Sequence, residues 1–108
     1  MESEMLKGHL DAVLLSVLEA GPAHGYAIIE AIRLRSDGTF DLPEGTIYPA
    51  LHRLEGLGLL ASKWETADSG RRRRIYSLTR LGVKTLRKRR DLWARFSSAI
   101  GSMLEGDA

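Results

Sequence analysis

The most informative segment of the chain is LPEGTIYPALHRLE, residues 42–55. We expect a helix here, because Asp41 offers an N-cap side chain, Pro43 stands near the first helical position and Glu44 adds a carboxylate to the first turn. An apolar stripe runs along this helix at Ile47, Ala50, Leu51, Leu54 and Leu57. Periodicity alone does not account for Pro49, since an interior proline removes a backbone hydrogen bond and usually kinks or ends a helix.

Two shorter helices are predicted upstream of this segment. Between His9 and Ala20 the apolar residues have the three- and four-residue spacing of an amphipathic helix, at Leu10, Val13, Leu14, Val17 and Leu18. Gly21-Pro22 ends this pattern, and a second helical pattern covers residues 25–35 until turn residues follow. The expected order up to residue 55 is therefore helix, tight turn, helix, helix.

A β-hairpin is predicted downstream. Residues 60–65 alternate between two faces, one of which carries Leu60, Ser62 and Trp64. Turn residues occupy positions 67–70, and the alternation resumes at Arg74, Tyr76 and Leu78. The returning strand of this hairpin starts with four arginines, residues 71–74.

A long final helix is predicted from Thr79, which can cap it, to about Leu104. Its apolar residues keep a seven-residue repeat, at Leu86, Trp93, Phe96, Ile100 and Met103. Such a stripe is typical of a coiled-coil seam. A helix this apolar on one side must bury it, so a homodimer with this seam as its interface is expected.

The charges are distributed unevenly. The chain has 108 residues, with 16 Lys plus Arg and 14 Asp plus Glu, which give a formal net charge of +2. Residues 71–90 contain ten of the basic residues and no acidic one, so this window carries +10 and the rest of the chain −8. A concentrated positive field attracts polyanions whatever the net charge, which favours nucleic acid or an anionic membrane surface as partner.

Several classes of site are not expected. The chain has no cysteine, and its three histidines are scattered, so neither a metal site nor a cofactor is predicted; His24 is expected to organise the start of the second helix. No catalytic constellation is present, so the chain is not expected to be an enzyme. Residues 1–5 lack a secretory signal, and no apolar run approaches the ~20 residues of a membrane span. A cytoplasmic protein is expected.

The order helix, helix, helix, hairpin, helix is the one expected of a winged helix-turn-helix DNA-binding domain with an added carboxy-terminal helix. Residues 42–55, followed by Gly58-Leu59-Leu60, resemble the signature of PadR-type transcriptional regulators. Further similarities are His24-Gly25-Tyr26, Gly70-Arg71-Arg72 and Tyr76-Ser77-Leu78-Thr79. The resemblance covers roughly residues 5–104, and a proline at the position of Pro49 is usual in the family's recognition helix.

The resemblance implies a mainly α-helical fold with a small β-hairpin. A winged helix-turn-helix DNA-binding domain is expected at residues 1–78, and a dimerisation helix with a short tail at residues 79–108, as in the family's short subgroup. The implied function is that of a sequence-specific transcriptional regulator, a ligand-responsive repressor that acts as a homodimer on an inverted-repeat operator. The alternative is an adaptor that binds polyanions or membrane surfaces through the basic carboxy-terminal helix.

The third helix is expected to contact DNA through residues away from its apolar stripe, namely Thr46, Tyr48, Pro49, His52 and Arg53. In the family the residue matching Tyr48 contacts DNA, and a phenol can reach a phosphate or base edge; packing on the wing is the alternative. The Thr46 hydroxyl suits either a phosphate or a helix cap. Arg53 suits either DNA or an ion pair with Glu55 or Glu30, and Pro49 contributes shape.

The hairpin residues expected to touch phosphates or the minor groove are Arg71, Arg72 and Arg73. Four adjacent arginines cannot all be neutralised by the two local acids, Glu65 and Asp68. Strand alternation should place Arg71 and Arg73 on one face and Arg72 and Arg74 on the other. The basic residues of the last helix, between Lys84 and Arg90, suit a solvated face as well as DNA.

Trp93 is expected to have a second role. In the short subgroup, a tryptophan similarly placed on the carboxy-terminal helix lines a cavity at the dimer interface that accepts flat aromatic or cationic compounds, and an indole can stack on such ligands. The residues expected to form the interface and this effector site are Trp93, Phe96, Ile100, Met103 and Leu14. The expected partners are double-stranded DNA, a second copy of the chain and a planar aromatic or cationic effector, with no membrane.

Overall fold

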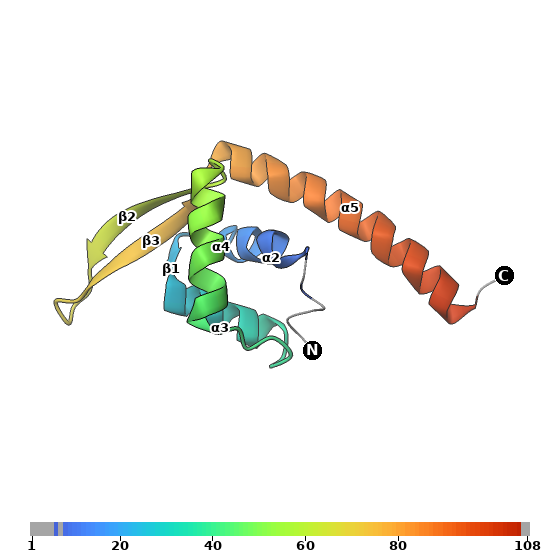
Figure 1. Cartoon of the computed structure of the whole chain (residues 1–108), viewed down its shortest axis with the longest axis horizontal. Coiled ribbons are helices and arrows are strands. Elements are labelled where there is room, and N and C mark those ends of the chain that lie inside the picture. The colour runs from blue at the N-terminus through green and yellow to red at the C-terminus, as the bar shows by residue number, and fades with distance from the viewer. Residues whose placement is uncertain (1–5, 7, 107–108) are drawn as a thin grey trace.

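The computed structural model describes residue 6 and residues 8–106 (Figure 1). Its elements in chain order are α2 (Leu10–Leu18), β1 (Ala23–His24), α3 (Gly25–Arg35), α4 (Glu44–Gly56), β2 (Leu60–Thr66), β3 (Arg72–Leu78) and α5 (Arg80–Glu105). Residues 1–5, on which the prediction of no secretory signal rests, lie outside the described residues. The helices and the small antiparallel sheet confirm the predicted mainly helical winged fold.

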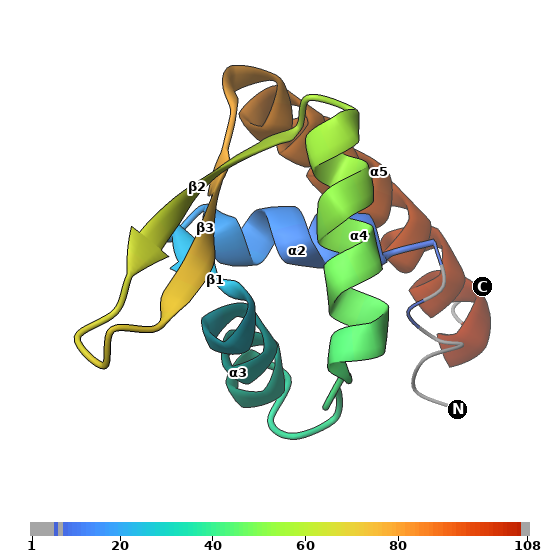
Figure 2. The ribbon, with the colours of Figure 1, turned by 60° about the vertical axis from the view of Figure 1, so that its left-hand side comes forward.

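The hydrophobic core lies between α2, α3 and α4, and the sheet and the first turns of α5 close it (Figure 2). Four of the five residues predicted for the buried stripe of α4 are buried, namely Ile47, Ala50, Leu51 and Leu54. Leu57 is exposed, because the helix ends at Gly56 and Leu57 is its C-cap. The opposite side of α4 is therefore the side left open to a partner.

The start of α4 differs from the prediction. The N-cap is Pro43, which makes no side-chain cap bond, so Asp41 lies two residues too far upstream to cap the helix. The Pro43 carbonyl instead accepts hydrogen bonds from the amides of Thr46 (3.0 Å) and Ile47 (3.2 Å). The predicted cap of α5 is confirmed, since Thr79 Oγ1 accepts a hydrogen bond from the Gly82 amide at 3.0 Å.

Helix α4 continues through Pro49 to Gly56. A helical N–H at position 49 would donate to the carbonyl of Gly45, one turn earlier. Both Gly45 and Pro49 lie on the exposed side of α4, so water can solvate the carbonyl that loses its helical donor. This position explains how the helix tolerates an interior proline.

The sheet has three antiparallel strands in the order β1-β3-β2. Strands β2 and β3 form the predicted hairpin, and we call residues 60–78 the wing. In its turn the Ala67 amide donates to the Arg71 carbonyl (2.8 Å), and Gly70 adopts a left-handed φ of 84°. Strand β1 pairs with β3 at Tyr76 and Ile75. Its two residues are too few for a period-two pattern to reveal, yet they attach the start of α3 to the wing.

The molecule is elongated, 60 Å along its longest axis, because α5 packs on the domain only through its first half (Figure 1). Leu86 is 2% exposed in the core, so the predicted seam is wrong at this position: the chain's own domain covers this turn of the helix. Further along, α5 exposes Leu92, Trp93, Phe96, Ile100, Met103 and Leu104. No helix in the described part of the chain is long and apolar enough to cross a membrane.

The first turn of α5 is fixed against the loop between α4 and β2. Thr79 Oγ1 donates a hydrogen bond to the Gly58 carbonyl (2.6 Å). Gly82 packs so closely on the Leu59 carbonyl that any Cβ there would clash with it. The end of α4, the base of the wing and the start of α5 therefore share one small contact region.

Candidate nucleic-acid interface

The open side of α4 presents a narrow surface. Three of its exposed positions are glycine or proline, so the helix backbone can approach another surface closely. A helix of this shape fits the width of a DNA major groove. The half-buried Thr46 lies in the first turn, and because Pro43 is the N-cap, the capping alternative for Thr46 is wrong. The exposed residues of this side are Gly45, Pro49, His52, Arg53 and Gly56.

Tyr48 is half-buried between the start of α3 and the wing. Its ring and hydroxyl lie so close to Gly25 that any Cβ at Gly25 would clash with them. Tyr48 and the arginines at positions 71–74 line the same hollow of about 320 Å³. Burial, followed by the nearby Glu44, raises the pKa of the Tyr48 hydroxyl, so it stays protonated at pH 7. A neutral phenol is therefore positioned beside the wing arginines.

Arg53 contacts α2. Its guanidinium donates to both oxygens of Asp11, at 2.8 and 2.7 Å, which corrects the predicted pairing with Glu55 or Glu30. The hydrogen bonds from Arg53 hold the pKa of Asp11 below its ordinary value despite the opposing effect of burial. Arg89 of α5 lies 3.9 Å from the same carboxylate. Asp11 thus joins the candidate recognition helix to α2 and approaches α5.

The wing arginines are of two kinds. Arg74 is held within the protein: its Nε donates to Ser62 Oγ (2.7 Å), and its Nη2 lies 3.5 Å from Glu55 of α4. Arg72 and Arg74 both lie over the Trp64 ring, which confirms that these two arginines share a face of the hairpin. Among the described residues, no carboxylate lies within ion-pair distance of the three other positions, Arg71, Arg72 and Arg73, and all three are exposed.

His24 has the structural role that the sequence predicts. Its Nδ1 accepts a hydrogen bond from the Ala27 amide (3.4 Å) and so caps α3. Burial, followed by repulsion from Arg73, lowers the pKa of His24, which keeps the imidazole neutral and able to accept at pH 7. Within the part of the chain that the structure describes, no group of His, Cys, Asp or Glu is arranged to hold a metal ion.

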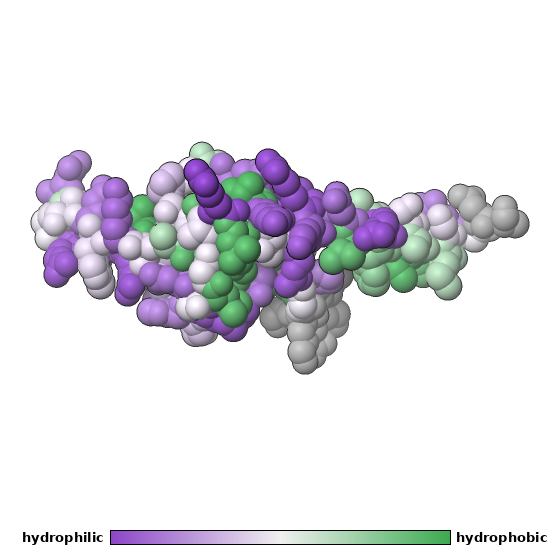
Figure 3. Space-filling view, turned by 90° about the horizontal axis from the view of Figure 1, so that it is seen from above, coloured by the Kyte–Doolittle hydropathy of each residue, from purple (hydrophilic) through white to green (hydrophobic). Residues whose placement is uncertain are grey.

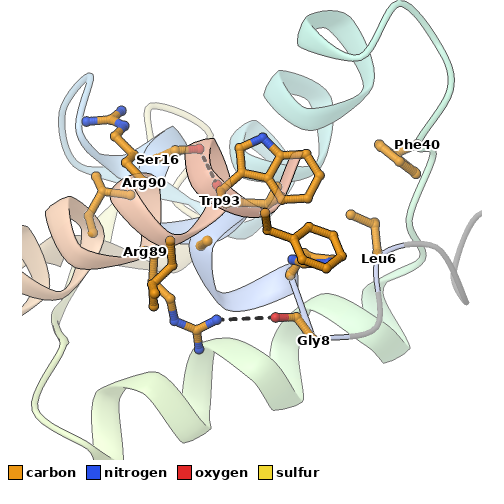
Figure 4. Close-up of a pocket in the computed structure, with 13 residues that line it drawn as sticks. Leu6, Gly8, Ser16, Phe40, Arg89, Arg90 and Trp93 are labelled. Atoms are coloured by element: carbon orange, nitrogen blue, oxygen red, sulfur yellow. Dashed lines mark hydrogen bonds between the residues drawn. The ribbon is translucent and has the colours of Figure 1, made fainter. Parts of the chain in front are cut away.

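A second candidate site lies between α2 and α5, where a hollow of about 690 Å³ opens beside Trp93 (Figure 4). The His9 ring meets the Trp93 ring edge to face, with centroids 5.1 Å apart, and Phe96 lies 5.9 Å from Trp93. Arg89 closes one side of the hollow by donating to the Gly8 carbonyl at 3.2 Å. The site therefore combines aromatic rings with a cationic rim.

The residues predicted for the effector site and dimer interface are divided between two environments. Trp93, Phe96, Ile100 and Met103 are exposed on α5, where Figure 3 shows hydrophobic surface on the projecting part of the molecule. Of these four, Trp93 and Phe96 line the hollow. Leu14 is wrong as an interface residue, because it is 0% exposed and its side of α2 faces the chain's own core.

The basic residues of α5 are partly committed to contacts with the same chain. Arg90 donates to both carboxylate oxygens of Glu19, at 2.9 and 2.6 Å, and Arg89 contacts the Gly8 carbonyl. Apart from the paired Arg90, the exposed basic residues between positions 84 and 90 are Lys84, Arg87 and Lys88. The positive charge available to a partner on α5 is thus smaller than the sequence count.

Sequence reasoning missed three residues near these sites. Trp64 is detectable in principle, because the predicted hairpin places it opposite Arg74, where cross-strand side chains meet. Asp11 is not, since its partner Arg53 lies 42 positions away and no local pattern indicates the pairing. A glycine at the start of a helix, such as Gly25, indicates that a close contact is possible there. That this contact is with Tyr48 depends on how α3 and α4 pack.

Comparison with known proteins identifies the family. The family model described as "Transcriptional regulator PadR-like family" matches residues 14–88, which include α3, α4 and the wing. The chain belongs to this family. PadR-like proteins are transcriptional regulators, so the chain is a transcriptional regulator, which implies that it binds DNA.

Solved structures support the PadR-like fold. A PadR family transcriptional regulator from Eggerthella lenta is 34% identical with a TM-score of 0.80, and the match covers 94% of this chain and 87% of that one. A transcriptional regulator from Clostridium thermocellum is 29% identical with a TM-score of 0.83, over 92% of this chain and 96% of that one. The transcriptional regulator YqjI of Escherichia coli is 32% identical over 84 residues, which are 78% of this chain but 39% of YqjI.

Proposed function

We propose that this PadR-like regulator is a homodimeric, ligand-responsive repressor that binds an inverted-repeat operator in double-stranded DNA. The observation that carries the proposal is the proximity of Tyr48 on α4 to the wing arginines around one hollow. In the proposed complex, α4 enters the major groove with its narrow open side. Arg71, Arg72 and Arg73 then reach the flanking backbone or the minor groove.

The exposed apolar side of α5 supports the homodimer. Trp93 and Phe96 are each more than half exposed, and Ile100 and Met103 continue the same stripe. A second copy of α5 would remove this surface from water, as expected for a C2 interface that uses the same patch twice. Two-fold symmetry then places the two α4 helices about one helical turn of DNA apart, which predicts an inverted repeat.

The hollow beside Trp93 supports the ligand response. A planar aromatic molecule can stack on the Trp93 ring in this hollow of about 690 Å³ between α2 and α5. Arg89 and Arg90 belong to its lining. Both lie close to carboxylates of the same chain, Asp11 and Glu19, so the hollow offers little unpaired positive charge and aromatic stacking is the main attraction for a ligand. Such a ligand regulates DNA binding only if its affinity differs between two arrangements of the dimer.

The test is a binding assay with the promoter fragment upstream of the protein's own gene, compared with random duplex of equal length. We expect sedimentation analysis to give a dimer and competition to show preference for a fragment that contains an inverted repeat. Equal affinity for every promoter fragment and for random duplex would contradict an operator. A planar dye should quench Trp93 fluorescence in a Trp64→Phe background. In a Trp93→Ala variant that still dimerises, the same dye should leave the fluorescence of the remaining Trp64 unchanged.

The second candidate function is an adaptor for anionic surfaces. The observation that favours it is the exposure of Lys84, Arg87 and Lys88 along α5. The combined change Arg71→Ala with Arg72→Ala separates the two functions. If this variant keeps the affinity for duplex DNA and its salt dependence, and if vesicles with anionic lipid bind the wild type, the adaptor function replaces the repressor.

A further inference from the structure

Trp64 is a large aromatic side chain outside the core, with 56% of its surface exposed. It lies on the same face of the sheet as Leu60 and Tyr76, which are buried under the helices. The sheet extends beyond the helices at Trp64, so the core does not cover the indole. Its position therefore needs an explanation other than packing of the core.

Two guanidinium groups lie over the Trp64 ring. The Arg72 guanidinium carbon is 4.9 Å from the ring centroid, and that of Arg74 is 5.6 Å away. Arg74 is directly opposite Trp64 in the antiparallel register, and Arg72 is its diagonal neighbour, opposite Thr66. A guanidinium stacked on an indole keeps its N–H groups at its edge, where they remain free to donate to a phosphate.

The stack is connected to the recognition helix. Arg74 donates to Ser62 Oγ at 2.7 Å, and Ser62 in turn donates to Glu55 of α4 at 2.6 Å. Arg74 also lies 3.5 Å from the Glu55 carboxylate. A continuous series of contacts thus runs from α4 through Arg74 and Trp64 to Arg72. Arg72 ends this series with its charge unpaired among the described residues.

We propose that Trp64 is a positioning residue for DNA binding, whose indole holds the Arg72 guanidinium at a fixed place relative to α4 so that both contact one duplex. The proposal rests on the proposed function, in which the wing contacts DNA. An arginine free to rotate on a hairpin loses side-chain freedom when it binds a phosphate. Stacking on Trp64 removes part of this loss in advance, which strengthens binding without a contact between Trp64 and a base.

The test compares Trp64→Leu, Trp64→Phe and Arg72→Ala for binding to a fluorescein-labelled, mixed-sequence duplex of about 30 base pairs, long enough for two half-sites. Anisotropy titrations over a series of salt concentrations give the affinity and its salt dependence. Trp64→Leu should weaken binding about 5-fold, because each of the two protomers must then order one more arginine side chain on binding. It should also reduce the slope of log K against log salt, although it removes no charge. Trp64→Phe, which retains a ring, should keep most of the affinity.

The slope separates positioning from a purely structural role, because a loss of fold stability does not change the number of phosphates contacted. In an Arg72→Ala background, Trp64→Leu should add less than about a 2-fold effect, since the residue that it positions is gone. The matched control is Leu81→Ala, which alters an apolar side chain of similar exposure, 51%, that takes no part in the stack and should leave the slope unchanged. Thermal unfolding identifies any variant that fails to fold. If Trp64→Leu does so, Trp64→Thr, which also lacks a ring and suits a strand, takes its place.

The outcomes distinguish this inference from the proposed function. If Arg72→Ala lowers the slope and Trp64→Leu does not, the wing contacts DNA but Trp64 does not position Arg72, and the inference is overturned. If neither Arg72→Ala nor Arg71→Ala lowers the slope, the wing does not contact phosphates and the proposed function fails with it. Equal losses from Trp64→Leu in the wild-type and Arg72→Ala backgrounds also overturn the inference.

Discussion

The end of the molecule that carries α4 and the wing differs from the projecting half of α5 in how its exposed side chains are held. Around α4, charged groups are fixed by neighbours in the same chain, Arg53 by Asp11 and Arg74 by Glu55. Along α5, apolar groups such as Ile100 are exposed without such support. The first surface is held in place by contacts within the chain, whereas the second would be buried in the proposed homodimer.

The largest effect is expected from a charge on the apolar side of α5. Ile100→Glu places a carboxylate where the proposed dimer removes water, so the dimer should dissociate with a constant at least about 100-fold higher. Operator affinity should fall with it, because a monomer presents one recognition helix. Sedimentation equilibrium measures the dissociation. The control is Ser98→Glu, which adds the same charge to another side of α5, and equal dissociation by both variants would contradict the proposed interface.

The next effect concerns the wing. The combined change Arg71→Ala and Arg72→Ala should weaken DNA binding about 10-fold or more at moderate salt and lower the salt slope, while the dimer stays intact. Salt-dependent anisotropy titrations measure both quantities. Arg33→Ala with Arg35→Ala removes the same charge from the last turn of α3 and should change the slope far less. A similar loss in both variants would show that net charge, rather than the wing, determines affinity.

The structure also shows which features of the fold can be predicted from the sequence. Local signals suffice where a pattern is complete within one element: α3 begins and ends at the expected Gly25 and Arg35, and Thr79 caps α5. They fail where competing local signals coexist, since Asp41, Pro43 and Glu44 each favour a helix start and only tertiary packing selects among them. The two-residue β1 has no pattern to detect.

Site residues are harder to predict, because a periodic stripe does not show what covers it. Leu86 and Trp93 belong to one heptad pattern on α5, yet Leu86 is buried in the chain's own core and Trp93 is 52% exposed. Leu14 likewise shares an apolar stripe whose partner is internal. The position of Arg53 on α4 predicts a contact with DNA or a nearby carboxylate, but its contact with Asp11 depends on the packing of α4 on α2.

A smaller effect should show how firmly α4 is held before DNA binds. Asp11→Asn weakens the hydrogen bonds to Arg53 and should lower the free energy of unfolding at pH 7 by about 1–2 kcal/mol. Because the pKa of Asp11 is lowered in the folded state, its contribution is fully present above the unfolded-state pKa near 3.8 and is lost as the pH falls through the folded-state pKa. Wild type and variant should therefore converge in stability below that range.

Urea unfolding at pH 7 and at a series of decreasing pH values below 3.8 measures this dependence. The control is Glu30→Gln, which breaks the exposed pair of Glu30 with Arg33 within α3 and should cost at most about 0.5 kcal/mol. If Asp11→Asn costs no more than this control at pH 7, α4 is not held by α2 through the ion pair, and the contrast between the two ends weakens.

The smallest effect is expected from one hydroxyl group. Tyr48→Phe keeps the ring that packs on Gly25 but removes the oxygen next to the wing arginines, so it should weaken DNA binding about 3- to 5-fold. The unfolding midpoint should stay close to that of the wild type. Anisotropy titration measures the DNA affinity, and thermal unfolding measures the midpoint. A change in stability with unchanged DNA affinity would make Tyr48 a packing residue alone.

The elongated shape of the chain has a mechanical consequence. If a second copy fixes the projecting half of α5, which is about 20 Å of helix, the rest of the 60 Å molecule acts as a lever arm of about 40 Å with the wing near its far end. A tilt of about 10° at the fixed end then displaces the far end by about 7 Å, roughly twice the rise of one base pair in DNA. A small rearrangement beside Trp93, which leaves the core unchanged, would therefore suffice to move the two α4 helices of the proposed dimer out of register with the grooves of the DNA.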